Sequence, residues 1–186
     1  MPHERVEFGV ARTKCNCSNC VANCECIPGY LIPSDLEPMI PPDVAPAAWA
    51  REHLRASSGA TIVRIHTDGR REVIHIPTLV PAHHNGLACH WLKQGRCEIH
   101  AIAPFGCAFF DCHQSERQVK DLSAQGIREV EDAHDKKGLY SRLWSMLWEE
   151  GLRAPSAMFK REALDAHLKE RQRRRTRNWL RPRRHY

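Results

Sequence analysis

Five cysteines stand within twelve residues in the stretch CNCSNCVANCEC, which spans residues 15–26. A second set of four follows much later, at Cys89, Cys97, Cys107 and Cys112. Thiolates are the ligands that zinc and iron–sulfur clusters share, and a tetrahedral site takes about four of them. The two sets, with no cysteine between residues 26 and 89 and none after residue 112, predict a metal or iron–sulfur centre built from two distant parts of the chain.

The composition and the N-terminal residues favour a cytosolic protein with one main domain. With 186 residues and 42% hydrophobic content, the chain can bury a modest core and carry an appendage. Residues 2–14 include Glu4, Arg5 and Glu7, so they hold no apolar segment typical of a signal peptide, and no run is long enough to cross a bilayer. Cytosolic thiols are kept reduced, so we favour metal binding over a disulfide framework or a redox couple. The odd count of nine cysteines also argues against disulfides, because one thiol would have no partner within the chain.

All nine cysteines are candidate metal ligands. The first five follow the pattern C-x-C-x2-C-x3-C-x-C, whose short spacers suit a loop wrapped around one ion. The second set is too widely spaced for one loop to close a site, so folding must bring its thiols together. One composite centre and two close centres both remain open, and two centres of four ligands would leave one thiol spare. The candidate ligands are Cys15, Cys17, Cys20, Cys24, Cys26, Cys89, Cys97, Cys107 and Cys112.

The expected cofactor is an iron–sulfur cluster or zinc. Iron–sulfur is favoured because nine thiols exceed what one structural zinc needs, and because apolar residues on both sides of Cys107 would shield a cluster from solvent. His90 and His113 adjoin cysteines and are alternative ligands, although a surface role is favoured for both. The pair His83-His84 is typical of an exposed loop. No catalytic residue can be assigned.

The stretch CHWLKQGRCEIHAIAPFGC at residues 89–107 resembles the signature C-x-x-L…C-x-I-Y-x-x-R-P-x-x-C-R of the YkgJ-like cysteine-cluster family. The segment YLIPSDL at residues 30–36 is similar to that family's Leu-Ile…Asp-Leu segment, so the resemblance covers residues 15–113. It implies a zinc- or iron-chelating domain. Histidine, alanine and alanine replace a tyrosine and two arginines of the signature at residues 100, 103 and 108. The resemblance assigns ligand roles most directly to Cys17, Cys20, Cys89, Cys97 and Cys107.

The sequence predicts an α+β fold, with a small, loop-rich cysteine-cluster domain that contains one β-hairpin and is covered by C-terminal helices. We divide the chain into a metal-binding domain at residues 1–113, a helical cover at 114–170 and a basic tail at 171–186. Ser34 and Glu37 have the capping-box pattern of a short helix. The predicted helices lie at about 35–40, from Pro46 to Ser57, at 114–135 with Gly126 interrupting the apolar stripe, at 139–150, and from near residue 156.

Two β-strands at residues 61–67 and 70–76 flank Asp68-Gly69, a strong signal for a two-residue hairpin turn. Counting outward from this turn pairs Ile65 with Glu72 and Val63 with Ile74. This register places four apolar side chains on one side of the hairpin, which we expect to face the core. They are Val63, Ile65, Ile74 and Ile76. Pro77 is expected to end the ladder.

The C-terminal residues carry the positive charge of the chain. Residues 157–186 hold eleven Lys and Arg against three acids, whereas the whole chain has a net charge of +6. A charge run of this kind is usually only solvated, but residues 171–186, with Trp179 and Tyr186, could also bind nucleic acid.

The leading hypothesis is a cytosolic metal-binding protein whose thiolates hold an iron–sulfur cluster or zinc in a structural or electron-transfer role. One alternative is an enzyme whose cluster or metal keeps an open coordination position for redox or group-transfer chemistry. Another is a nucleic-acid-associated module that uses the basic tail. The expected partners are therefore a metal ion or cluster and, through residues 171–186, a nucleic acid, with no membrane.

Overall fold

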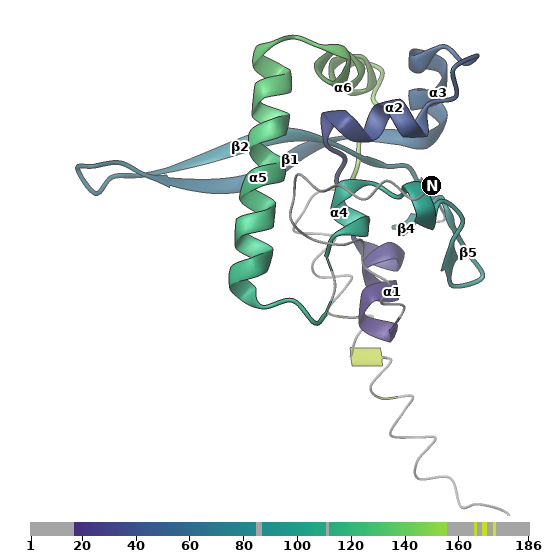
Figure 1. Ribbon diagram of the computed structural model, residues 1–186, viewed down its shortest axis with the longest axis horizontal. Helices are drawn as coiled ribbons and strands as arrows, with labels where there is room; N and C mark the ends of the chain where they lie inside the picture. Colours follow the sequence, from purple (N-terminus) through teal and green to yellow (C-terminus); the bar gives the residue numbers. More distant parts are fainter. Residues whose placement is uncertain are drawn as a thin grey trace, which may run out of the picture.

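The computed structural model describes residues 17–84, 87–110 and 112–155, together with residues 166, 169, 170 and 173. The expected α+β class is confirmed (Figure 1). The order of elements is α1 (Ser18–Cys26), η2 (Pro33–Asp35), α2 (Leu36–Met39), α3 (Pro46–His53), β1 (Leu54–Ile65), β2 (Arg71–Pro81), β3 (His83–His84), β4 (Ala88–Cys89), β5 (Leu92–Lys93), β6 (Arg96–Cys97), η3 (His100–Ile102), α4 (Phe105–Ala108), α5 (Glu116–Asp135) and α6 (Leu139–Glu149).

The described strands form three separate antiparallel pairs, β1–β2, β3–β4 and β5–β6. The first pair is a long ribbon whose turn lies far from the body of the molecule, while α5 lies across it (Figure 1). The other two pairs are two residues long on each strand and follow one another closely in the chain. These short pairs matter because Cys89 and Cys97 lie in them.

The register of the ribbon differs by one residue from our prediction. Ile65 pairs with Arg71 and Val63 with Val73, because the connection is longer than the two-residue turn we predicted. The N–H of His66 donates to the carbonyl of Arg70 at 2.9 Å, and the N–H of Gly69 donates to the carbonyl of His66 at the same distance. A shift of one residue moves side chains to the opposite face. The predicted core face was therefore wrong for Ile65, which is 66% exposed, as is Val73 at 58%, whereas Ile76 is buried and Ile74 packs against the core as predicted.

The ribbon also continues past Pro77, where we expected it to stop. Pairing resumes after an irregularity at residues 57–60 and ends where Leu54 pairs with Pro81. Gly59 makes this bulge possible, because its φ is +103° and a Cβ there would overlap the carbonyl of Ile76. A bulge tolerates a proline, which has no N–H to give to the ladder. The helix that starts at Pro46 consequently ends at His53 rather than near Ser57.

The two longest helices agree with their apolar patterns. Helix α5 begins after Ser115, whose hydroxyl accepts the N–H of Gln118 at 3.3 Å while the Gln118 side chain accepts the N–H of Ser115 at 2.8 Å. It continues through Gly126 because the bare Cα lets the ring of Phe105 and the hydroxyl of Tyr30 approach closely. The buried side chains of these helices are Leu122, Ile127 and Val130 of α5 and Tyr140, Leu143 and Leu147 of α6.

Two buried polar side chains tie the segment after α1 to the rest of the core. The hydroxyl of Tyr140 donates to the carbonyl of Leu31 and accepts the N–H of Leu79, both at 2.8 Å. The carboxylate of Asp35 accepts the N–H groups of Ile32 at 2.8 Å and Phe105 at 2.9 Å.

The cap predicted at Ser34 was wrong: its hydroxyl lies 3.3 Å from the Glu129 carboxylate, while Asp35 precedes α2 and its carboxylate binds back to the N–H of Ile32. The predicted helix near residue 156 and the basic tail fall almost entirely outside the described residues. None of the helices within the described ranges combines the length and apolar character that crossing a bilayer requires.

Candidate metal centre

Helix α1 determines where the first set of cysteines points. We expected a loop wrapped around an ion, but residues 18–26 are helical, with Cys17 as the residue that precedes the first turn. Residues three and four apart lie on one face of a helix. Cys17, Cys20 and Cys24 are spaced in this way, so they form one line along α1. Cys26 does not fit this spacing, and it is 5% exposed.

Three cysteines from both sets come together at the first turn of α1. The Sγ atoms of Cys17, Cys20 and Cys112 all lie within 4.8 Å of one another, and those of Cys17 and Cys112 are 3.4 Å apart. Zinc bound tetrahedrally at about 2.3 Å from each sulfur implies about 3.8 Å between sulfurs. The three thiols, which we call the Cys17 trio, are thus close enough to bind one metal ion. Cys17 and Cys20 are half-buried and Cys112 is exposed.

Four further cysteines form a second group, which we call the Cys24 quartet. Each member comes from a different element, namely Cys24 from α1, Cys89 from β4, Cys97 from β6 and Cys107 from α4. Helix α1 packs against β4, which brings Cys24 and Cys89 to the same region. The four thiols lie close enough that each pair among them interacts electrostatically.

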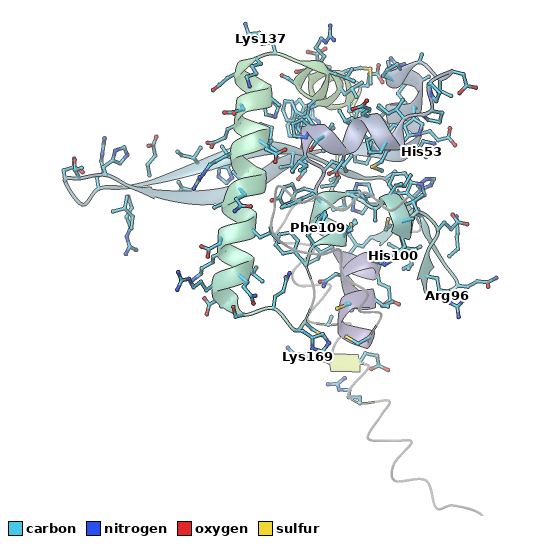
Figure 2. The ribbon with its side chains drawn as sticks, in the orientation of Figure 1. His53, Arg96, His100, Phe109, Lys137 and Lys169 are labelled. Atoms are coloured by element: carbon cyan, nitrogen blue, oxygen red, sulfur yellow. The ribbon has the colours of Figure 1, made fainter. Side chains whose placement is uncertain are left out.

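Strand pairing positions two members of the quartet. Cys89 pairs with His83 across β3–β4, and Cys97 pairs with Leu92 across β5–β6. Figure 2 shows Arg96 at the far end of the β5–β6 hairpin, pointing away from the body. The hairpin therefore presents its arginine to solvent while the next residue, Cys97, returns toward the base.

Burial is the largest cause of the raised pKa of three quartet thiols, Cys24, Cys89 and Cys107. It raises the pKa of Cys24 from 9.0 to about 11, with smaller contributions from Cys97 and Glu25. It raises the pKa of Cys89 to about 12, although backbone N–H groups of Trp91 and Leu92 act in the opposite direction. The pKa of Cys107 lies well above 9.0, again chiefly because of burial. Without a metal these thiols are neutral at pH 7, so metal binding must release their protons.

A close approach of two backbone segments supplies a hydrogen bond to Cys107. The N–H of Gly29 donates to the Sγ of Cys107 at 3.2 Å, and the N–H of Gly106 donates to the carbonyl of Tyr30 at 2.9 Å. A Cβ on either glycine would overlap the opposite backbone. The sequence signal for this contact was only a glycine after Pro28 and another before Cys107, and our sequence reasoning missed it.

The histidines that adjoin cysteines have other neighbours. His90 Nε2 lies 2.9 Å from His53 Nδ1, and both rings contact Trp91. His83 is half-buried in β3, so the expectation of an exposed loop was wrong for that residue, and His113 is exposed. Among the described residues, Cys26 is the thiol outside both groups; burial, then Glu25, raises its pKa. Cys15 lies outside the described residues, so its predicted ligand role stays a prediction.

No family model, curated protein or solved structure matches this chain. The resemblance to the YkgJ-like family therefore stays a prediction.

Proposed function

We propose that this chain is a cytosolic metal-binding protein that holds zinc or an iron–sulfur cluster in a structural or electron-transfer role. The observation that carries the proposal is the Cys17 trio, in which three thiols lie within 4.8 Å of one another. Two of them come from the first set of cysteines and one from the second, 95 residues after Cys17. Such a group matches the ligand preference of thiophilic metals.

The trio suits a structural role because of what a metal would connect there. Cys17 and Cys20 belong to the start of α1, whereas Cys112 precedes α5 by a few residues. A metal bound by all three would join these two segments and reduce the conformational freedom of the chain between them. The positive end of the α1 dipole also lies beside Cys17 and Cys20, which stabilises negatively charged ligands.

Metal analysis of matched variants tests the proposal. Wild-type protein purified without added metal, under anaerobic conditions, should contain stoichiometric zinc or iron. Cys112→Ser removes one ligand of the trio at an exposed position, so we expect lower metal content with an unchanged circular dichroism spectrum. Cys26→Ala is the control, because Cys26 lies outside both groups and should not affect metal content. Full metal content in Cys112→Ser would contradict the proposed site.

A further inference from the structure

We propose that Cys24, Cys89, Cys97 and Cys107 form a second metal centre, separate from the Cys17 trio, and that this centre holds an iron–sulfur cluster. The proposal deepens the metal-binding function proposed above, but it rests on different thiols.

The two groups share no cysteine, although α1 contributes to both. Cys20 of the trio and Cys24 of the quartet are four residues apart on α1, which corresponds to about 6 Å along a helix axis. The remaining ligands of the quartet come from β4, β6 and α4, whereas the trio is completed by Cys112. Helix α1 thus acts as a rigid spacer with one group at its first turn and the other at its second half.

The quartet is largely shielded from solvent, because Cys89 is buried and the other three cysteines are half-buried. Several residues that lie near the quartet cysteines in sequence are apolar and buried, and they are Trp91, Ala103, Phe105 and Ala108. Three backbone N–H groups point at its sulfurs, from Gly29 to Cys107 and from Trp91 and Leu92 to Cys89. Hydrogen bonds to the sulfurs and exclusion of solvent are the means by which proteins set the potential of iron–sulfur clusters.

The spacing of the sulfurs favours a cluster over a single ion. All four residues belong to the described part of the chain, and no three of their Sγ atoms lie within 4.8 Å of one another as those of the trio do. One zinc ion would hold its thiolates about 3.8 Å apart. In a cluster of four irons and four sulfides each thiolate binds its own iron, so the thiolates are held farther apart. The quartet thiols interact electrostatically yet include no set of three within 4.8 Å of one another, which matches this second geometry.

The experiment compares the full-length chain with two single variants, each reconstituted anaerobically with iron and sulfide. Cys112→Ser alters only the trio, and Cys97→Ser alters only the quartet, at a half-buried position on a short hairpin. Iron and acid-labile sulfide are measured together with Mössbauer spectra. We expect Cys112→Ser to retain the labile sulfide and the cluster spectrum of the wild type. Cys97→Ser should lose most of both, while the far-ultraviolet circular dichroism spectrum shows that it remains folded.

Two results would overturn this inference. If Cys112→Ser loses the labile sulfide and Cys97→Ser keeps it, the cluster belongs to the trio. If neither the wild type nor Cys112→Ser takes up sulfide, and X-ray absorption of Cys112→Ser shows one zinc with four sulfur neighbours, the quartet is a mononuclear site. These results can be distinguished from a failure of the proposed function. If the trio binds no metal, Cys112→Ser keeps its full metal content, and Cys97→Ser still loses the labile sulfide. Cys26→Ala is again the control, with metal and sulfide expected at wild-type levels.

If Cys97→Ser fails to fold, spectroscopy of Cys112→Ser alone tests whether the quartet binds the cluster. That variant retains all four quartet cysteines and lacks a complete trio. A cluster spectrum in Cys112→Ser therefore supports the quartet assignment, and its absence contradicts it.

Discussion

The N–H of Gly29 lies 3.2 Å from the Sγ of Cys107, although 78 residues separate the two in sequence. This hydrogen bond joins the segment after α1, which carries Cys24, to α4, which carries Cys107. It requires the backbones of Gly29 and Gly106 to pass each other more closely than any side chain would permit. Metal binding and folding are therefore expected to depend on the same contact.

Gly29→Ala should destabilise the protein and lower its metal content. The new methyl group would overlap the backbone of Gly106, which cannot rotate away as a flexible side chain could. Overpacking of this kind costs typically about 1–3 kcal/mol, and displacement of α4 would also move Cys107. Urea denaturation and metal analysis measure the two effects. Gly138→Ala is the matched control, because nothing lies within 4 Å of its Cβ position. Equal stability of the two variants would contradict the close approach.

Asp35→Ala should also destabilise the contact between the segment after α1 and α4. Its carboxylate accepts the N–H groups of Ile32 and Phe105, so its loss leaves two buried donors without their partner. Unsatisfied buried donors cost about 1–3 kcal/mol each, more when the lost partner is charged. We expect a lower denaturation midpoint and reduced metal retention, because Phe105 begins the helix that carries Cys107. Ser34→Ala serves as the neighbouring control and should have little effect, since Ser34 is exposed and its contact with Glu129 at 3.3 Å lies at the surface.

The fold could be predicted wherever a local pattern was sufficient. The apolar spacing within residues 114–135 and 139–150 located α5 and α6 to within a few residues. The existence of the hairpin followed from Asp68-Gly69, but its register did not. Ile62 and Val63 are adjacent and both β-branched, so the sequence suits either face of the strand. Only the length of the connection, five residues rather than two, decided which face turned inward.

The register can be tested by substitutions on the two faces of the ribbon. Ile65→Thr should change the free energy of unfolding by no more than about 0.5 kcal/mol, because Ile65 is 66% exposed. Ile76→Ala should cost about 2–5 kcal/mol, because Ile76 is buried in the core. Both residues would be equally sensitive in the register that the two-residue turn implied. A large loss of stability in Ile65→Thr would thus favour that register.

The sequence indicated which residues form the candidate site, but it did not indicate how these residues are grouped in space. Sequence spacing singled out the cysteines, yet it divided them into an N-terminal set and a later set, whereas each spatial group draws on both. The stretch 18–26 lacks an apolar stripe and is rich in asparagine, so nothing local indicated a helix. The spacing of Cys17, Cys20 and Cys24 becomes meaningful only once that helix exists. The contact between Gly29 and Gly106 is long-range, and two glycines 77 residues apart do not by themselves indicate that they meet.

The raised pKa values of the quartet thiols make the stability of the metal-free protein depend on pH. The pKa of Cys24 is raised from 9.0 to about 11, so in the unfolded chain this thiol ionises at a lower pH than in the folded protein. Above pH 9 the folded state binds more protons than the unfolded state, and stability falls as pH rises toward 11. The fall approaches about 1.4 kcal/mol per pH unit for each such thiol. Below pH 9 this contribution is constant.

Urea denaturation of reduced, metal-free protein between pH 8 and pH 10 measures this dependence, with an ordinary thiol pKa of 9.0 at the centre of the range. The matched comparison is Cys24→Ala, which removes one buried thiol and should show a shallower decline. Working below pH 10 limits the contribution of Tyr30 and Tyr140, whose pKa values are also raised from 10.0 by burial. An identical slope in wild type and Cys24→Ala would show that the pKa of Cys24 is not raised in the metal-free protein, and it would contradict the placement of Cys24 beside the other quartet thiols.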